Sequence, residues 1–542
     1  MKHRLLYIPI FFLLALSFVD CAKKGTPSGG SRDTIAPVIV RSSPENHSIN
    51  FTGNEIEIRF NEYIKLKDID KQLIISPPLK YRPVITPFNT SKTLKIKIID
   101  TLRPNTTYAF DFGKSIVDNN EGNEFEYFKY IFSTGSYIDS LRLSGKVRDA
   151  KLISAEVPAT VMLYEATANY SDSLVYTEKP IYVTRTKDTT GIFEFTNLKE
   201  GKYNLVALID KSNDYNFQPK SDKIGFVNEV ITIPTDSTYL LTLFKEIPAY
   251  KIARPTLISK HHIIFGYEGD AENLKIDVLS SLPTDYEARI YKDEKKDSLH
   301  YWFKPQLDVD SMVFKVTNIN RIDTATVRIR DLSKDSLSIS AIKTGTLRLK
   351  DTFKLRSNIP LVSYDSEKFQ VMARDSSIIE STVKLNIKYN WAEIYFPKAE
   401  TQGYAIKLFP GALTDFFGKT NDTLQYNINT NNAADYGTLS LNLVNVNRIP
   451  IIVQLVDGKF NVVDEKSLSS PGAELQSDKN VFFDEINPDK YYIRIIYDEN
   501  GNGKWDTGNF LDRKSPERII YYPSIIEVRA NWSLNETFIL KL

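Results

Sequence analysis

Short runs in which apolar and polar residues alternate are the feature that most restricts the fold of this 542-residue chain. "EIEIRFNEYI" places Ile56, Ile58 and Phe60 on one face, and "TLKIKI" and "TYAFDF" repeat the pattern. Successive side chains of a β-strand point to opposite faces, so a period of two predicts half-buried strands. No long stretch beyond residue 36 has a helical period. The sequence therefore predicts an all-β chain of antiparallel β-sandwiches in series.

Composition agrees with sheets and argues against several functions. Tyr and Phe number 30 each, and such residues favour strands over helices. The net charge of +1 gives no long-range field for nucleic acid. The sequence contains no H-E-x-x-H, G-x-S-x-G or phosphate-loop pattern, so we predict no enzyme. At about 150 residues per domain, the length suggests three or four domains.

The N-terminus predicts export. Met1–Arg4 is positively charged, and Leu5–Val19 is an apolar run of signal-peptide length, shorter than a typical membrane span. Cys21, the single cysteine, follows this run and precedes a flexible tether over residues 22–35. A simple signal peptide with a bystander cysteine is the alternative to a lipid anchor.

Cys21 resembles the acylated cysteine of bacterial lipoproteins. The resemblance implies a signal peptide over residues 1–21, acylation of Cys21, for example with palmitate, and outer-membrane lipid as a partner. The preceding "FVD" departs from the lipoprotein motif because Asp20 is not small. The following "AKK" lacks the acidic run of a surface-export signal, so we expect a lipid-anchored protein that faces the periplasm.

Two kinds of sandwich are indicated by resemblance. "APVIVRSSPENHSINFTGNEIEIRFNEYI" and "SIVDNNEGN" resemble the SbsA-type bacterial Ig-like domain, which is expected over residues 36–136. The stretch after it resembles the transthyretin-like, or carboxypeptidase regulatory-like, domain, which is expected over residues 137–249. Seven residues carry this second resemblance: Gly191, Phe193, Phe195, Leu198, Gly201, Tyr203 and Leu205.

An internal repeat extends the pattern to the C-terminus. "GKYNLVALIDKSNDYNF" and "DKYYIRIIYDENGNGKW" align without gaps, which pairs Tyr203 with Tyr491 and Asp210 with Asp498. "YAIKLFPGALTDFFGKTNDTL" likewise echoes the first Ig-like segment. The remaining predicted domains are a β-rich middle domain at 250–355, a second Ig-like domain at 356–431 and a second transthyretin-like sandwich at 432–542.

The loop "DENGNGKWD" in the second copy has the spacing of a calcium loop. Side-chain oxygens stand at positions one, three, five and nine, and a glycine at position six permits the bend that turns the next carbonyl inward. Asn509 replaces the bidentate Glu at position twelve, so we expect weak, structural calcium binding at about 10⁻⁴–10⁻³ M. The predicted ligands are Asp498, Asn500, Asn502, Lys504 and Asp506.

A hairpin turn that binds no metal explains the same residues. "NGNG" contains two Asn-Gly dipeptides, a strong signal for a tight turn between strands. In the first copy, Asp210, Ser212 and Asp214 keep the ligand spacing, but Tyr215 replaces the glycine. Asp512 and Glu517 are candidates for one further ligand in the second copy. Both alternatives give the loop a structural role.

Histidines and tryptophans offer weaker candidates. His261 and His262 are neighbours in a strand-like run, so their side chains point to opposite faces and cannot easily chelate one ion. Aromatic faces can stack on sugar rings, but such residues more often belong to a sandwich core. The four candidates are Trp302, Trp391, Trp505 and Trp532.

Asp followed by Ser or Thr and then an apolar residue or Thr recurs along the chain, and it resembles the acceptor motif of a periplasmic O-glycosylation system. Turn formation is the alternative, because Asp-Ser and Asp-Thr also start turns. The copies begin at Asp33, Asp139, Asp172, Asp236, Asp297, Asp335 and Asp422.

These features predict a non-catalytic, membrane-anchored lipoprotein that acts as a binding or scaffolding module in the bacterial envelope. A carbohydrate-binding or adhesin-like lipoprotein is the alternative. The expected partners are outer-membrane lipid through Cys21 and an envelope protein complex or glycan, with no nucleic acid. Apart from residues 250–355, the chain resembles uncharacterised gram-negative outer-membrane lipoproteins with an N-terminal Ig-like domain.

Overall fold

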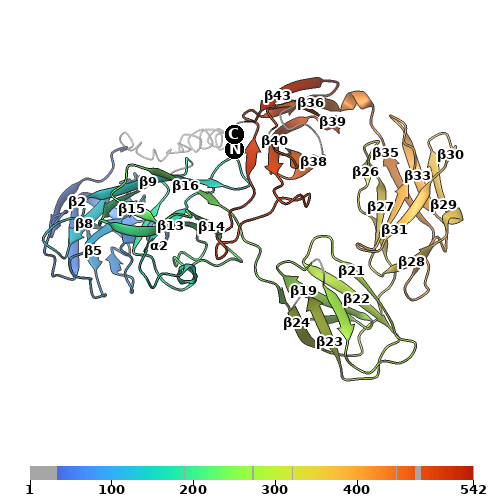
Figure 1. The fold of residues 1–542 in the computed structure, drawn as a ribbon, viewed down its shortest axis with the longest axis horizontal. Coiled ribbons are helices and arrows are strands. Elements are labelled where there is room, and N and C mark those ends of the chain that lie inside the picture. Colours follow the sequence, from blue (N-terminus) through green and yellow to red (C-terminus); the bar gives the residue numbers. More distant parts are fainter. Residues whose placement is uncertain are drawn as a thin grey trace, which may run out of the picture. The chain divides into compact units, whose positions relative to one another are not determined.

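The computed structural model describes residues 33–187, 190–271, 274–319, 321–446, 448–469 and 478–540. The predicted signal peptide, Cys21 and most of the tether lie outside these residues. Almost every described element is a strand (Figure 1). The exceptions are the α-helix α2 (Ile69–Gln72) and the 3₁₀ turns η1 (Asp172–Tyr176), η2 (Ser366–Lys368) and η3 (Ala433–Asp435). The predicted all-β class is confirmed.

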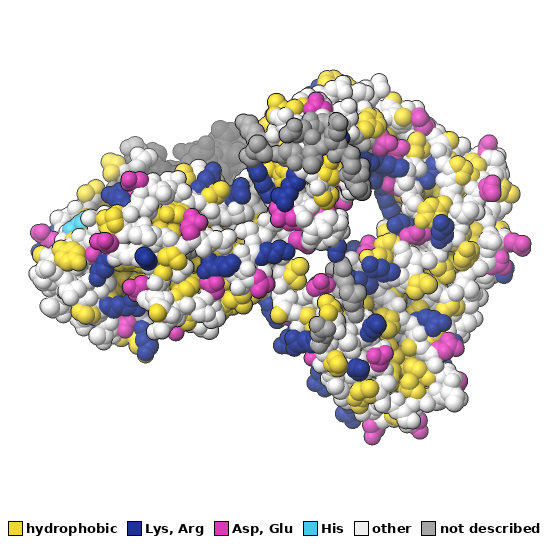
Figure 2. All heavy atoms as spheres, viewed as in Figure 1, with side chains coloured by type: hydrophobic (Ala, Val, Ile, Leu, Met, Phe, Trp, Pro, Cys, Tyr) yellow, Lys and Arg dark blue, Asp and Glu magenta, His cyan; other side chains and the backbone are white. Residues whose placement is uncertain are grey.

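The chain divides into two compact units. The first contains Met1–Arg142, Pro180–Thr184 and Phe195–Gly201. The second contains Leu143–Lys179, Arg185–Glu194 and Lys202–Leu542. No helix in the described ranges combines the length and the apolar character needed to cross a membrane. On the face seen in Figure 2, basic and acidic side chains are interspersed, in agreement with the net charge of +1.

The first sandwich packs two sheets around one core. Its sheets have the orders β1-β2-β5-β4, with β7 also on β2, and β3-β6-β8. The predicted inward residues Ile56, Ile58 and Phe60 are at most 1% exposed because every second residue of β2 faces the core. The strands are β1 (Ile39–Ser43), β2 (Glu55–Leu66), β3 (Ile74–Ser76), β4 (Val84–Thr86), β5 (Ser91–Lys97), β6 (Thr107–Asp111), β7 (Ile116–Asp118) and β8 (Lys129–Ser133).

The second sandwich begins and ends with strands that pair in parallel, β9 and β16. In its other sheet, β13 lies between β10 and β14 and also pairs with β15. Its strands are β9 (Leu141–Asp149), β10 (Thr160–Glu165), β11 (Tyr182–Arg185), β12 (Ile192–Leu198), β13 (Gly201–Ile209), β14 (Lys223–Phe226), β15 (Ile231–Ile233) and β16 (Thr238–Leu243).

The third sandwich has an aromatic core. Phe265 and Phe314 come from opposite sheets and meet edge to face, with ring centroids 5.1 Å apart. The sheet orders are β17-β19-β22-β21, with β18 on β19, and β20-β23-β24. The strands are β17 (Lys251–Ile252), β18 (Thr256–Ser259), β19 (His262–Glu268), β20 (Lys275–Val278), β21 (Glu287–Lys292), β22 (Ser298–Lys304), β23 (Ser311–Asn318) and β24 (Arg321–Arg328).

The fourth sandwich begins earlier than predicted. Strands β25 and β27 pair in the order β25-β27-β32-β31, and β26 joins the sheet β26-β35-β33-β29-β30. It therefore begins at Ile339 rather than at residue 356. The segment "SLSISAIKTGT" is rich in small polar residues, so its two short strands lack a strong apolar alternation. The strands are β25 (Ile339–Ala341), β26 (Gly345–Thr346), β27 (Phe353–Ser357), β28 (Leu361–Tyr364), β29 (Phe369–Ala373), β30 (Ile378–Ile379), β31 (Thr382–Asn386), β32 (Trp391–Tyr395), β33 (Gly403–Leu408), β34 (Leu413–Asp415) and β35 (Leu424–Asn429).

The fifth sandwich repeats the pairing of the second. Its first strand, β36, pairs in parallel with its last, β43, while β40 lies between β37 and β41 and also pairs with β42. Asp210 and Asp498 each follow the equivalent strand, β13 or β40, so the sequence repeat is also a structural repeat. The strands are β36 (Gly437–Val444), β37 (Ile451–Val456), β38 (Val462–Leu468), β39 (Lys479–Ile486), β40 (Asp489–Tyr497), β41 (Ile519–Tyr521), β42 (Ile526–Val528) and β43 (Ser533–Ile539).

Candidate functional site

The loop over residues 498–518 joins β40 to β41 and contains the predicted calcium ligands. Asp498 at its start is only 3% exposed. One carboxylate oxygen, Oδ1, accepts the amide of Asn502 at 3.1 Å, and Oδ2 accepts the amide of Gly503 at 2.8 Å. Asp498 therefore caps the turn by accepting two of its backbone amides.

The structure brings together three of the other predicted ligands. The side-chain amides of Asn500 and Asn502 both donate to Oδ2 of Asp506, the second at 2.8 Å. Lys504 donates its backbone amide to Oδ1 of Asn502 at 2.8 Å. Gly503, at φ 76°, has the left-handed backbone conformation that glycine adopts without strain. The loop thus converges its side chains on Asp506.

Glu517 closes the loop from its far end. This side chain is 5% exposed and accepts the amides of Glu499 at 2.7 Å and Asp506 at 2.9 Å. Its backbone carbonyl accepts the indole N–H of Trp505 at 3.0 Å. Glu517 therefore ties both arms of the loop together, whereas Asp512, the other candidate for a further ligand, donates its amide to Asn509.

The loop of the first copy is built on the same plan. Asp210 accepts the amides of Ser212 at 3.0 Å and Tyr215 at 2.8 Å. Asp222 is fully buried and accepts the amides of Lys211 and Gln218. An aspartate cap after the strand and a second buried acid thus recur in both copies, and they explain the alternating polar residues without a metal.

Oxygen donors of the second loop still fit calcium chemistry. Asp498 and Asp506 supply two carboxylates, and the asparagines supply amide oxygens, all of which are hard ligands. In the part of the chain that the structure describes, no three His, Cys, Asp or Glu residues cluster as a metal site. Calcium at this loop therefore remains a prediction.

From Trp505 to Arg518 the loop packs on the second sandwich; we call residues 505–518 the docking loop. Arg513 donates through Nε to Oδ2 of Asp172 at 2.7 Å and through Nη2 to Oδ1 of the same carboxylate. Its Nη1 also donates to the carbonyl of Val227 at 3.1 Å. A bidentate guanidinium–carboxylate pair fixes both distance and orientation. Neither residue was singled out for this role from the sequence.

Phe510 is the apolar anchor of the docking loop. Its side chain is fully buried, 5.4 Å from the ring of Phe226 and 6.4 Å from that of Tyr176, measured between centroids. Gly508 lies so close to Phe244 that an added Cβ would come within 2.8 Å of that ring. The docking loop is therefore shaped to the surface of the second sandwich.

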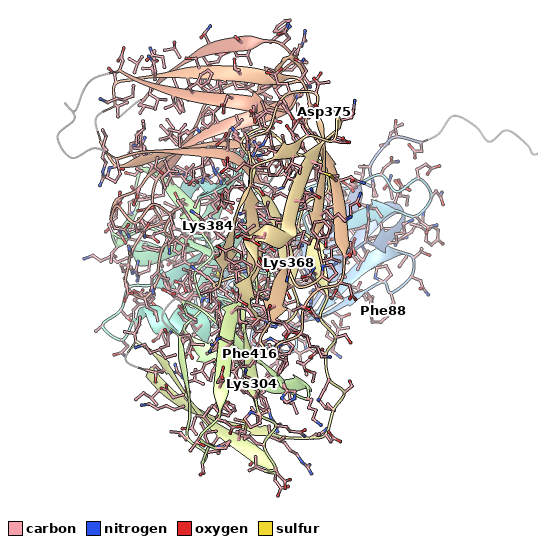
Figure 3. The ribbon with its side chains drawn as sticks, turned by 90° about the vertical axis from the view of Figure 1, so that its right-hand side faces the viewer. Phe88, Lys304, Lys368, Asp375, Lys384 and Phe416 are labelled. Carbon is pink, nitrogen blue, oxygen red and sulfur yellow. The ribbon has the colours of Figure 1, made fainter. Side chains whose placement is uncertain are left out.

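Further contacts join the third sandwich to the fourth. Figure 3 labels Lys304 and Phe416, and the Lys304 ammonium lies 4.7 Å from the centroid of the Phe416 ring. Trp302 is 1% exposed and packs with Phe416 and Ile359. The hydroxyl of Tyr291 donates to the carbonyl of Asn358 at 2.9 Å. Aromatic side chains thus take part in each of these contacts between the third and fourth sandwiches.

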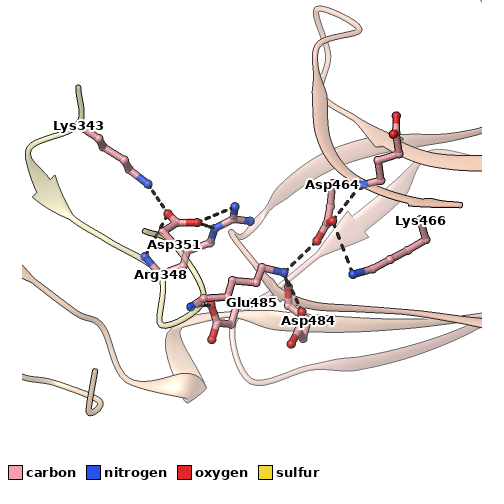
Figure 4. Close-up of polar contacts among 9 residues, drawn as sticks. Lys343, Arg348, Asp351, Asp464, Lys466, Asp484 and Glu485 are labelled. Atoms are coloured by element: carbon pink, nitrogen blue, oxygen red, sulfur yellow. Dashed lines mark hydrogen bonds and ion pairs between the residues drawn. The ribbon is translucent and has the colours of Figure 1, made fainter. Parts of the chain in front are cut away.

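Charge links the fourth sandwich to the fifth. Lys350 Nζ lies 2.9 Å from Oδ2 of Asp464 and 2.7 Å from Oδ1 of Asp484. Asp351 beside it is paired with Arg348 and Lys343 (Figure 4). The pKa of Lys350 lies above its ordinary value because hydrogen bonds to the two aspartates outweigh burial. The second unit is thus held by several joints of different chemistry.

A stack of four rings lies on the third sandwich at its contact with the fourth. Their centroids are 4.6 Å apart from Tyr291 to His300, 5.0 Å from His300 to His262 and 4.1 Å from His262 to Trp302. Nε2 of His262 lies 2.9 Å from Nδ1 of His300, whose Nε2 lies 3.2 Å from Asp293 Oδ2. Burial, with the charge of His300, lowers the pKa of His262 to about 3.

His262 thus has a partner that the sequence did not indicate. His261 and His262 do diverge, as expected for neighbours in a strand, and His261 lies against the ring of Phe417. Pairing of β19 with β22 brings His300 to His262 from 38 positions away. Only knowledge of strand register could have predicted this contact.

The tryptophans do not form a shared sugar-binding platform. They belong to three different sandwiches, with Trp302 buried and Trp532 52% exposed. Lysine ammonium groups lie over Trp391 and Trp505, at 4.8 and 4.1 Å from the ring centroids. Trp302 is thus core, as the structural alternative predicts.

Most of the Asp-Ser and Asp-Thr hydroxyls are accessible. Ser298 is 6% exposed and is closed to a modifying enzyme in the folded chain. The others are exposed: Thr34, Ser140, Ser173, Ser237, Ser336 and Thr423.

Comparison with known proteins identifies the first sandwich. Residues 33–134 match the bacterial Ig-like domain family. The match confirms the predicted Ig-like domain at the N-terminal end of the series. No curated protein matches the chain.

Solved structures with similarity to this chain are also multi-domain. The S-layer protein rSbsC(31-844) is 14% identical with a TM-score of 0.15, and the alignment covers 90% of this chain and 67% of that one. Immunoglobulin domains 1–4 of Sidekick-1 are 9% identical with a TM-score of 0.17, over 74% of this chain and 95% of that one. Similarity at this level carries no conclusion about activity or partners.

Proposed function

We propose that this chain is a non-catalytic, lipid-anchored lipoprotein whose sandwiches act as a binding or scaffolding module in the bacterial envelope. The observation that carries the proposal is the contact of the docking loop with the second sandwich, where Arg513 and Phe510 fix one copy of the repeat on the other. Fixed joints hold binding surfaces at set positions, which a scaffold requires and a flexible string of domains does not provide. The bacterial Ig-like domain and the apolar run before Cys21 support an exported location.

A pull-down from gently crosslinked cells, read by mass spectrometry, tests the scaffold. The full chain carries a C-terminal tag, so that its N-terminus is processed normally. Recovery of a defined envelope protein complex is the expected result. Recovery of lipid and glycan alone would contradict scaffolding and favour the carbohydrate-binding alternative.

Cys21→Ser is expected to remove the protein from the outer-membrane fraction. Without the thiol no acyl chain can be attached at residue 21, so the lipid anchor is lost. Fractionation followed by intact-mass analysis measures both effects. Ser17→Ala, within the apolar run, is the control and should leave fractionation unchanged. A Cys21→Ser chain that stays in the outer membrane would show that another feature anchors the protein.

The 498–506 loop, on this proposal, binds calcium weakly and structurally. Calcium should change the fluorescence of Trp505, whose indole is bonded to Glu517, with a midpoint of about 10⁻⁴–10⁻³ M. Asp506→Asn removes one of the two carboxylates and should abolish the change. Glu527→Gln, at an exposed residue paired with Arg529 in the same sandwich, is the matched control. If calcium does not change the fluorescence of the native chain, the loop is a turn that binds no metal.

A further inference from the structure

A cavity of about 390 Å³ lies in the second unit beside the docking loop. The first copy of the repeat supplies part of its wall from β9, β14 and β16, and the second copy supplies residues 515–521. Phe226, Leu240, Phe244 and Ile519 contribute apolar surface to the lining. Cavities of this size are near the lower end of the range for small-molecule sites.

Two arginines, Arg148 and Arg518, also line the cavity. Arg148 donates through Nε to the hydroxyl of Thr242 at 2.8 Å, which fixes its guanidinium beside β16. The pKa of Arg148 lies below its ordinary value because of burial and the like charge of Arg518. Both positive charges line the same cavity, and an anion bound there would offset their repulsion.

The acidic residues of the lining are already committed elsewhere. Asp149 accepts the amides of Lys151 and Leu152 through Oδ1, and its Oδ2 lies 2.6 Å from Lys223 Nζ. Glu517 closes the loop as described above.

We propose that this cavity binds a small amphiphilic oxyanion, with a phosphate or carboxylate head at Arg148 and Arg518 and an apolar body against Phe226 and Phe244. Guanidinium groups bind such heads through paired, charge-assisted hydrogen bonds. Burial of a short hydrocarbon chain against the apolar residues adds a hydrophobic contribution to the binding free energy. Because both copies of the repeat line the cavity, a bound ligand favours the docked arrangement of the loop by linkage.

Isothermal titration calorimetry on the full chain in non-ionic detergent tests the site, with hexyl phosphate and hexanoate as probes. At least one probe should bind with one-to-one stoichiometry. Arg148→Gln and Arg518→Gln should each weaken binding by about tenfold or more, because each removes a charged donor pair. Arg529→Gln, an exposed arginine of the fifth sandwich, is the control. Unchanged thermal unfolding of each variant shows that the fold is kept.

Two further probes separate the contribution of the charged head from that of the hydrocarbon chain. Inorganic phosphate has only the head, and hexyl glucoside has the chain with a neutral head. Inorganic phosphate should bind more weakly than hexyl phosphate, and hexyl glucoside should not compete. Equal binding of inorganic and hexyl phosphate would overturn the role of the apolar wall and indicate a free anion site. Binding of hexyl glucoside as tight as that of the anions, or binding unaffected by both arginine substitutions, would overturn the proposal. These titrations do not depend on the pull-down, so the proposed oxyanion site and the proposed scaffolding function are tested independently.

Discussion

Phe510→Ala is expected to release the docking loop from the second sandwich. Removing a fully buried phenylalanine leaves a cavity and lowers the free energy of unfolding by about 3–5 kcal/mol. The rings of Phe226 and Tyr176 would lose their contact with the docking loop. Loss of that anchor also exposes the Arg513–Asp172 pair to water, where ion pairs contribute little. Hydrogen exchange read by mass spectrometry should show faster exchange in peptides over residues 172–176, 223–227 and 505–518.

A matched control separates release of the loop from general destabilisation. Phe482→Ala removes a phenylalanine of the same sandwich that is 56% exposed, and it should change exchange little. Peptides from β36 and β43 should be unaffected in both variants. If Phe510→Ala behaves like Phe482→Ala, the docking loop is not held by Phe510.

The third sandwich is expected to lose stability as the pH falls from about 6.5 towards 3, because of His262. Burial and His300 hold its folded pKa at about 3, below its ordinary value of 6.5. Between these pH values the unfolded chain binds a proton that the folded chain does not. The stability that neutral His262 contributes is therefore complete above pH 6.5 and is lost on acidification. The loss is about 2 kcal/mol at a pH near 5 and about 4–5 kcal/mol at full titration.

Few titratable groups among the described residues face His262, and the strands that hold it are the ones to measure. His300, Trp302 and, through His300, Asp293 face it from the third sandwich, and the fourth sandwich packs against Trp302. Hydrogen exchange in urea, at neutral pH and near pH 5, gives the opening free energy of peptides over β19 and β22. His262→Gln keeps a side chain that can form a hydrogen bond with His300 and should remove most of the pH dependence. His47→Asn, at an exposed histidine of the first sandwich, should leave it unchanged.

Periodicity explains what the sequence could predict. The alternation at Ile56, Ile58 and Phe60 specifies strands with one buried face, because a strand has no other way to place them together. The gapless repeat around Asp210 and Asp498 likewise predicts equivalent loops, and both are observed after equivalent strands. The bacterial Ig-like resemblance was confirmed over the first sandwich.

The features that the sequence could not predict are contacts between residues far apart in the chain. Arg513 and Asp172 are 341 positions apart, and nothing local marks either residue as half of an ion pair. Glu517 was one of two nearby acids that could supply a further metal ligand, and its carboxylate accepts two backbone amides of the loop. The acylation of Cys21 and the binding of calcium are chemical questions that strand patterns do not address.

Parallel pairing of the first and last strands gives the repeated sandwich a mechanical property. In the fifth sandwich, Thr438 to Val444 lie in register with Ser533 to Ile539, and β9 and β16 are arranged alike. The start of the first strand and the end of the last strand then lie at opposite ends of the ladder. Tension between these points loads the hydrogen bonds of the ladder in shear, so they resist together instead of opening one at a time. A protein anchored at one end and loaded at the other would transmit force through such a sandwich without unravelling it.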